Sequence, residues 1–233
     1  MIAVNVVGFK NSGKTTVAVR LARALAQRGR RVAGAKFAHC RFDRENADTG
    51  KLAEVCRVVA GLSPEETMLL WPRKRYLPDL LPLLDCDTLV VEGGKELGWL
   101  PRIVLAREDA DLAPLGSDLA LAVFGAAGTG NEPTDEDIER AADMVIERGF
   151  ALPGLDCGDC GRENCRELAA DIVAGRAAPG DCRSVGGGLR ITVGGKPIGL
   201  NHFTQDLVAG TLRGLLSTLK GYSPGPVTIE FDG

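Results

Sequence analysis

Short apolar runs alternate with amphipathic stretches over the first 150 residues. The apolar runs predict strands of a largely buried sheet. These runs are residues 4–7, 31–38, 88–94, 102–106 and 119–124. Residues 15–27 and 134–148 place apolar side chains at helical spacing instead. A strand, a helix and a second strand in succession form a βαβ unit, which implies parallel pairing. We therefore expect one α/β layer domain with a mainly parallel sheet.

Shorter elements are expected in the polar interval between the second and third runs. Residues 51–59 are predicted to form a short helix. Ser63 is followed by Pro64 and, three positions after the serine, by Glu66. This is the pattern of a helix start with serine as the N-cap, so a helix is predicted to begin there.

The pattern changes after Gly149. The elements predicted for the rest of the chain are helices at 163–174 and 203–219, a hairpin at 189–200 and a closing strand at 227–231. The chain is therefore predicted to have three parts: a sheet domain of residues 1–150, a cysteine-rich module of residues 151–185, and a small ββαβ unit of residues 186–233.

Composition narrows the classes of function. With 233 residues, of which 45% are hydrophobic, the chain can bury a substantial core. A net charge of −3 with scattered basic residues argues against a general nucleic-acid binder. No stretch approaches 18 apolar residues, so no membrane span is expected. The first apolar run lacks a cationic leader and is followed at once by a glycine-rich motif, so we expect a cytoplasmic protein.

That motif has the G-x-x-x-x-G-K-[ST] spacing of a phosphate-binding loop, from Gly8 to Thr15. The glycines let backbone N–H groups turn toward phosphate oxygens. Lys14 brings a cation to the β- and γ-phosphates, and the Thr15 hydroxyl can bind Mg²⁺. The helix that follows adds its positive N-terminal end. The residues predicted to bind the nucleotide here are Gly8, Asn11, Ser12, Gly13, Lys14, Thr15 and Thr16.

A nucleotide hydrolase also needs a carboxylate beside Mg²⁺, usually at the end of a neighbouring strand. Glu92 is the best candidate, because an apolar strand leads into it and glycines follow. Asp43 and Asp48, in a polar loop, are rivals for that task. Lys36 ends a predicted strand and is expected to face the phosphates. Each of these residues could instead be an ordinary surface charge. The Asn-Lys-x-Asp motif that reads guanine is absent, so the base is not identified.

Four of the seven cysteines lie close together in the sequence, at Cys157, Cys160, Cys165 and Cys182. Four thiolates suit either a 4Fe–4S cluster or structural zinc. The C-x2-C-x4-C spacing favours a cluster, because zinc sites more often pair two C-x2-C knuckles. Glycines beside the first two cysteines expose N–H groups that could bond cluster sulfurs. Zinc and unliganded or disulfide-linked thiols remain the alternatives.

The first 150 residues resemble the MobB family of molybdopterin guanine dinucleotide biosynthesis. The resemblance rests on G-F-K-N-S-G-K-T-T at residues 8–16, on the stretch from Lys36 to Asp43, on Asp48-Thr49, and on Val91-Glu92-Gly93 with Lys95. It implies GTP with Mg²⁺, and Glu92 near the metal. Lys36, Asp48 and Lys95 join the nucleotide site on the same ground. The family also implies a P-loop NTPase fold, a homodimer, and help in delivering nucleotide to the molybdopterin cofactor.

The cysteine-rich module is similar to the small iron–sulfur module of corrinoid iron–sulfur proteins and of the Rnf electron-transport B subunit. L-P-x3-C-G-x-C-G-x4-C, a helix and a distant cysteine carry the likeness. Arg183 stands where that module has proline after the last cysteine. The resemblance favours a 4Fe–4S cluster.

We expect an accessory protein that binds GTP (or ATP) and assists biosynthesis or delivery of a molybdenum or tungsten pterin cofactor. A slow hydrolysis is expected, in which Lys14 and Mg²⁺ stabilise charge and a loop acid, with Asp43 as candidate, positions water. Expected partners are molybdopterin and a molybdenum, tungsten or other metalloenzyme client. Alternatives are a nucleotide-gated electron-transfer or metallocluster-maturation protein, and a binding module with structural zinc.

Overall fold

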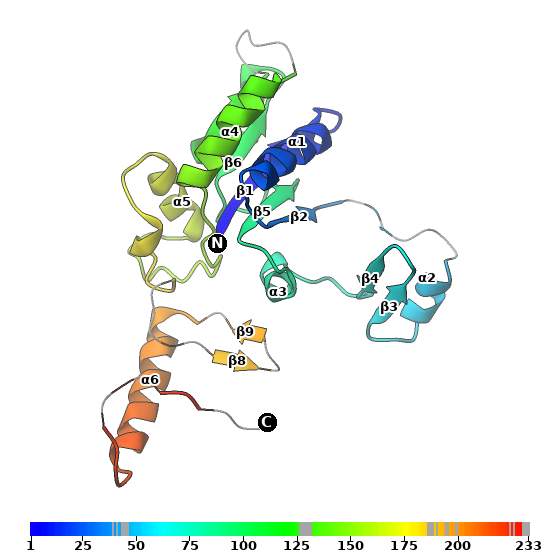
Figure 1. Ribbon diagram of the computed structural model, residues 1–233. Helices are drawn as coiled ribbons and strands as arrows, with labels where there is room; N and C mark the ends of the chain where they lie inside the picture. Colours follow the sequence, from blue (N-terminus) through cyan, green and yellow to red (C-terminus); the bar gives the residue numbers. More distant parts are fainter. Residues whose placement is uncertain are drawn as a thin grey trace.

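The computed structural model shows a parallel sheet with helices on both faces (Figure 1). It describes residues 1–38, 40, 42, 47–125, 132–185, 189, 191–193, 196–198, 200–223, 225 and 227–229. The five-stranded sheet has the order β2-β5-β1-β6-β7, and every neighbouring pair is parallel. Its strands are β1 (Ile2–Gly8), β2 (Val32–Lys36), β5 (Thr88–Glu92), β6 (Arg102–Leu105) and β7 (Ala120–Phe124). The predicted α/β fold with a mainly parallel sheet is confirmed.

Helices α1 (Lys14–Gln27) and α4 (Asp135–Arg148) lie side by side on one face of the sheet (Figure 1). Alternate residues of β1 point to opposite faces, so Val4 and Val6 pack against these helices. The helical side chains in the same core include Val17, Leu21, Leu25, Ile138, Ala141 and Val145. Thr134 caps α4, because its hydroxyl accepts a hydrogen bond from the Asp137 amide.

The opposite face of the sheet is covered by the cysteine-rich stretch. Helix α5 (Cys165–Val173) buries Leu168 completely, in one core with Leu89 and Val91 of β5. Cys165 and Cys182 belong to the same core. The stretch therefore shares its apolar contacts with the sheet and does not rely on a core of its own.

Residues 47–83 depart from the sequence prediction. Helix α2 (Asp48–Ala53) begins earlier than predicted, and β3 (Val59–Leu62) pairs antiparallel with β4 (Thr67–Leu70). The predicted helix start at Ser63 is wrong: the Ser63 hydroxyl accepts from the amides of Glu65 and Glu66 and closes a turn between these strands. A serine that can cap a helix can close a turn with the same hydrogen bonds. Helix α3 (Leu77–Leu80) and the 3-10 turn Leu81–Leu83 follow.

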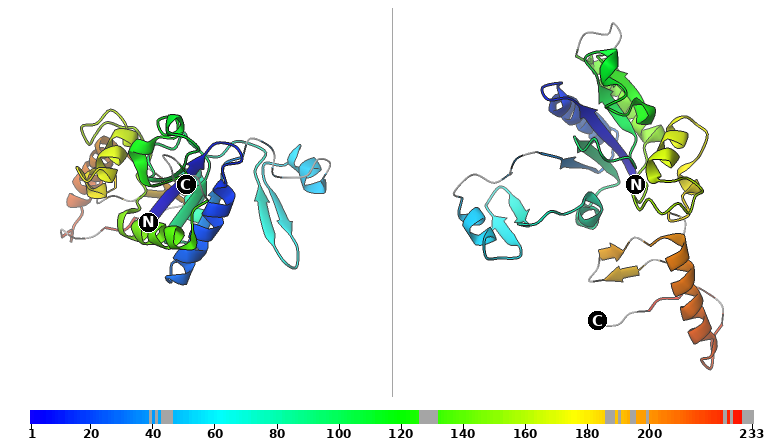
Figure 2. Two further views of the ribbon diagram at one scale, coloured as in Figure 1. Left: turned by 90° about the horizontal axis from the view of Figure 1, so that it is seen from above. Right: turned by 180° about the vertical axis from the view of Figure 1, so that it is seen from behind.

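The C-terminal part contains a hairpin and a helix, set apart from the sheet in Figures 1 and 2. Strand β8 (Ile191–Val193) pairs antiparallel with β9 (Lys196–Ile198), and α6 (His202–Ser217) follows. The fourth element of the predicted ββαβ unit is not found, because residues 227–229 are not in a strand. Two residues of that prediction, 230 and 231, lie outside the described residues. Over the part of the chain that is described, no helix is both long and apolar enough to cross a membrane.

A buried arginine holds together the loops that follow β5 and β6. Arg102 on β6 is 1% exposed. Its guanidinium donates to the carbonyl oxygens of Leu115 at 2.5 Å, Lys95 at 2.5 Å and Leu97 at 3.2 Å. Burial, together with the nearby charge of Arg166, lowers the pKa of Arg102 to about 10. Burial of this cation costs desolvation free energy, and the three hydrogen bonds to loop carbonyls offset part of that cost.

Replacement of Arg102 by methionine should lower the free energy of unfolding by about 3 kcal/mol or more, because it leaves buried carbonyls without donors. Urea denaturation with an unchanged m-value measures the loss. The matched control is Arg140→Met on the exposed side of α4, where only surface ion pairs with Glu136 and Asp137 are lost. Equal stability of the two variants would contradict the assigned role of Arg102.

Candidate functional site

The register of three parallel strands brings an acid and a lysine beside the glycine-rich loop. Val6 of β1 pairs with Glu92 of β5, and Glu92 pairs with Lys36 of β2. The Thr15 hydroxyl donates to Glu92 Oε1 at 2.9 Å. Lys36 Nζ donates to Glu92 Oε2 at 2.6 Å and lies 3.5 Å from Thr15 Oγ1. The Lys36 ammonium thus bridges the carboxylate and the hydroxyl that the sequence assigned to Mg²⁺.

The loop from Gly8 to Lys14 has the backbone of an anion-binding turn. Gly13 has φ +81° and Asn11 has φ +62°, both in the left-handed region. A Cβ added at Gly8 would lie 2.3 Å from Ser12 Oγ, so only glycine fits there. Ser12 Oγ is buried and has no hydrogen-bond partner among the described residues. An orphaned donor in this loop is the feature expected where a phosphate oxygen binds.

Cations surround this loop. Burial lowers the pKa of Lys14, and the charges of Lys36, Lys95 and Arg107 lower that pKa further, while Glu92 opposes them. Lys14 Nζ donates to the Phe9 carbonyl at 2.5 Å. These four cations repel one another, and Glu92 is the one acid among the described residues that acts on Lys14 with them. A bound polyanion would relieve this repulsion, so the arrangement favours binding of one.

Two of these cations reach the loop from other strand ends. Lys95 Nζ lies 4.7 Å from the centre of the Phe9 ring. The Arg107 guanidinium donates to the Lys10 carbonyl. Arg107 was not among the residues predicted from the sequence. It lies two residues after the end of β6, the strand that pairs with β1, and this pairing is not readable from the sequence.

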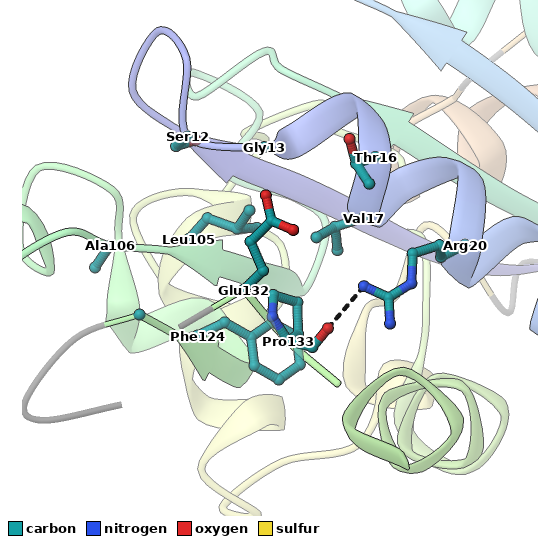
Figure 3. A pocket seen from close by; sticks show the side chains of 11 residues that line it. Ser12, Gly13, Thr16, Val17, Arg20, Leu105, Ala106, Phe124, Glu132 and Pro133 are labelled. Atoms are coloured by element: carbon teal, nitrogen blue, oxygen red, sulfur yellow. Dashed lines mark hydrogen bonds between the residues drawn. The ribbon is translucent and has the colours of Figure 1, made fainter. Parts of the chain in front are cut away.

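A small cavity of about 110 Å³ lies on the other side of the loop, between the start of α1 and the ends of β6 and β7 (Figure 3). Its lining residues are Ser12, Gly13, Thr16, Val17, Arg20, Leu105, Ala106, Phe124, Gly125, Glu132 and Pro133. Thr16, predicted to bind nucleotide, therefore lines this cavity, together with Ser12 and Gly13.

The loop acids differ from Glu92 in their placement. Asp48 is the first residue of α2 and pairs with Lys51 at 3.0 Å. Figure 1 places α2, together with β3 and β4, apart from the sheet and from the start of α1, so the structure does not bring the first turn of α2 to the glycine-rich loop. Asp43 lies outside the described residues.

The four clustered cysteines are all free thiols. Cys165 and Cys182 are buried, and burial raises the pKa of each thiol. Cys157 and Cys160 are half-buried and lie within electrostatic range of Cys182. Among the described residues, no group of three or more histidine, cysteine or acidic side chains already converges on a metal position. The set nevertheless supplies four soft donors, of which Cys165 and Cys182 lie in the core shared with the sheet and Cys160 packs against it.

The backbone around these thiols offers N–H groups and open turns. The Asp156 amide donates to Cys165 Sγ at 3.4 Å, and the Asp156 carboxylate accepts from the Cys165 amide at 2.7 Å. Gly158 has φ +75° and Gly161 has φ +80°, so both turns require glycine. Cys165 is the first residue of α5, and Asn164 caps that helix. These features match the donor chemistry of a thiolate-bound cluster.

One loop, residues 93–101, touches both regions. At its start, Asn5 Nδ2 donates to the Gly94 carbonyl at 3.0 Å, and Lys95 follows over the Phe9 ring. At its far end, the Trp99 carbonyl accepts from the Leu152 amide at 3.1 Å. A Cβ added at Gly154 would lie 2.9 Å from the Trp99 ring, so the backbone before the first cysteine packs directly on this tryptophan.

Two protein-family models match the chain. Residues 3–125 match the family described as "Molybdopterin guanine dinucleotide synthesis protein B", or MobB. Residues 152–184 match a family described as "Putative Fe-S cluster". The two matches do not overlap, and between them they contain the glycine-rich loop, Glu92 and all four clustered cysteines.

Similar proteins agree with these matches. A curated relative from Methanocaldococcus jannaschii, named "Putative molybdopterin-guanine dinucleotide biosynthesis adapter protein", is 26% identical over 100% of this chain and 98% of its own length. The crystal structure of Bacillus subtilis MobB superposes with a TM-score of 0.51 at 24% identity, covering 64% of this chain and 99% of the other. The latter similarity supports the fold of the sheet domain alone.

Proposed function

The chain belongs to the MobB family, whose model covers more than half of its 233 residues, and we propose that it is a GTP-binding accessory protein with slow GTPase activity. It would assist biosynthesis or delivery of the guanine dinucleotide form of a molybdenum or tungsten pterin cofactor. Molybdopterin and a client metalloenzyme are the proposed partners. The proposal includes a homodimer in the cytoplasm.

The observation that carries this proposal is the contact of Thr15, Glu92 and Lys36. A hydroxyl after the phosphate-loop lysine and a carboxylate from a neighbouring strand are the two protein ligands that hold Mg²⁺ in P-loop NTPases. Here these two oxygens are 2.9 Å apart, and a lysine ammonium already bridges them. The residues present therefore fit a divalent cation.

Each residue then has a proposed task. Thr15 and Glu92 would hold Mg²⁺, which would supply positive charge next to the terminal phosphates. Lys14 exchanges the Phe9 carbonyl for phosphate oxygens, and Ser12 Oγ finds the partner that it lacks. Lys36 adds a second cation on the same side. Asp43 remains the proposed residue for positioning the attacking water.

The cysteine module is proposed to hold a 4Fe–4S cluster through Cys157, Cys160, Cys165 and Cys182. Four free thiols of which two are buried, and glycine turns at the first two cysteines, support this assignment. The cluster would supply one-electron chemistry or a structural staple. We propose the division into a nucleotide-binding part (1–150), the cluster module (151–185) and a small α+β unit (186–233).

A second candidate function, nucleotide-gated electron transfer, is favoured by the loop at residues 93–101. Lys95 lies beside the phosphate loop and Trp99 packs on the chain before Cys157. The Arg102 guanidinium donates to the backbone carbonyls of Lys95 and Leu97 in the same loop. A change at the nucleotide site could therefore reach the cysteine module through one contiguous segment.

Replacement of Lys14 by alanine tests the nucleotide site. Loss of a charge-assisted contact to phosphate should weaken GTP binding at least about 10-fold. Glu92→Gln should instead remove most of the difference in GTP affinity between buffer with Mg²⁺ and buffer with EDTA. Isothermal titration measures both. Lys51→Ala, in the exposed helix α2, is the control and should bind GTP normally. Unchanged affinity in Lys14→Ala would refute the assigned phosphate site.

Anaerobically purified protein should be brown, with about four iron and four sulfide per chain and a broad absorbance near ~400 nm that dithionite bleaches. Cys160→Ser and Cys182→Ser should lose that absorbance. Cys56→Ser, at an exposed thiol outside the module, should keep it. A colourless protein with stoichiometric zinc would establish the structural-zinc alternative instead.

Nucleotide-gated electron transfer predicts that binding of GTP with Mg²⁺ changes the fluorescence of Trp99. Trp71→Phe leaves Trp99 as the single tryptophan, since the sequence has two. In the same variant, GTP should shift the midpoint potential of the cluster, and a tenfold coupling corresponds to about 59 mV for one electron. Both signals should vanish when Lys14→Ala is added. A potential that is identical with and without GTP rules out gating.

A further inference from the structure

The glycine-rich loop has two chemically different sides. Glu92 and Lys36 stand on the side of β5 and β2. The small cavity lies on the opposite side, at the ends of β6 and β7 (Figure 3). With Thr15 and Glu92 as the proposed holders of Mg²⁺ next to the terminal phosphates, a nucleotide with its phosphates on the loop would extend its sugar and base away from Glu92. That direction leads into the cavity, past Thr16.

The cavity suits a planar ring. Pockets that enclose a drug-sized ligand measure about 300–1,000 Å³, so the roughly 110 Å³ here can hold one flat part of a ligand and not the whole nucleotide. Its walls are mainly apolar, from Val17, Leu105, Phe124 and Pro133. An apolar slot that opens beside a phosphate-binding loop is the environment expected for a nucleobase.

One carboxylate lines this slot. Glu132 extends from beside Pro133 toward the start of α1 (Figure 3). Its backbone neighbour is fixed: Pro133 is buried, and its carbonyl accepts from Arg20 Nη1 at 2.7 Å. Arg20 Nη2 also binds Asp135 at 2.8 Å, which ties α1 to the first turn of α4. The residue that follows Glu132 is therefore tied to α1, while Glu132 itself is exposed.

We propose that Glu132 is the specificity-determining residue for the base, and that its carboxylate accepts hydrogen bonds from N1–H and the 2-amino group of guanine. This rests on the proposed nucleotide-binding function. An ionised carboxylate can only accept. Guanine presents two adjacent donors on that edge, whereas adenine presents the N1 acceptor and one amine. In proteins that have an Asn-Lys-x-Asp motif, the motif recognises guanine. This chain lacks the motif, and Glu132 takes over the recognition of the base.

Glu132→Gln is the decisive variant, because the amide keeps the size of the side chain and replaces one acceptor by a donor. Titrations of the full-length protein with GTP, ITP and ATP in Mg²⁺ measure affinity. Wild-type protein should prefer GTP to ATP, and ITP, which lacks the 2-amino group, should bind more weakly than GTP. In Glu132→Gln the ratio of GTP to ATP affinity should fall about 10- to 100-fold, mainly through weaker GTP binding.

Two further variants separate the possible failures. Glu136→Gln, a neighbouring acid on the exposed side of α4 that pairs with Arg140, should keep the preference for GTP. Lys14→Ala should weaken all three nucleotides together. If Lys14→Ala does so but Glu132→Gln weakens GTP and ATP equally, or changes neither, the phosphate site stands and the role of Glu132 is overturned. If Lys14→Ala also changes nothing, the proposed function itself is wrong.

Discussion

The parallel pairing of β2, β5 and β1 is the constraint on which the site depends. In a parallel sheet the carboxyl ends of neighbouring strands meet at one edge, so residues far apart in the chain become neighbours there. The pairing of Val6 with Glu92, and of Glu92 with Lys36, places the acid and the lysine at the edge of the sheet where β1 turns into α1. A shift of β5 by one residue would turn Glu92 to the other face and break the contact with Thr15.

Residues around this edge serve the site at some cost to local stability. Asn5 lies in the middle of β1, is fully buried, and has an Oδ1 without a partner among the described residues. Its other amide atom holds the Gly94 carbonyl. Arg102, the register partner of Asn5 on β6, is buried as well and holds the next carbonyls of the same loop. Two polar side chains in the sheet thus fix the backbone that presents Lys95, and such local costs are typical of functional sites.

The parts of the site that the sequence revealed are those with a local pattern. The glycine-rich loop has fixed spacing, and Glu92 follows an apolar strand, so both could be recognised without a structure. Arg107 and Glu132 were not recognised, because the order of the strands in the sheet decides which segments meet at the loop. Arg107 follows β6, and Glu132 lies just before α4.

The wrong predictions of secondary structure have a common physical origin. Ser63 makes the hydrogen bonds of a helix cap, but the pairing of β3 with β4 uses them to close a turn. Residues 227–229 alternate like a strand, yet a strand needs a partner, and these residues have none assigned in the described sheets. Periodicity records which side chains could be buried together. It does not record which backbone groups find partners, and that depends on the fold as a whole.

The loop at residues 93–101 shows why the two parts of the chain should be considered together. Arg102 binds the carbonyls of Lys95 and Leu97 and that of Leu115 on the next loop. These hydrogen bonds hold the backbone between Lys95, beside the phosphate loop, and Trp99, beside the cysteine module. Contact alone is not coupling, because a ligand shifts only an equilibrium between arrangements that it binds with different affinity. Under the proposed function, a nucleotide polyanion beside Lys95 would favour one position of that ammonium over others, and the proposed gating would act through the packing of Trp99 against Gly154.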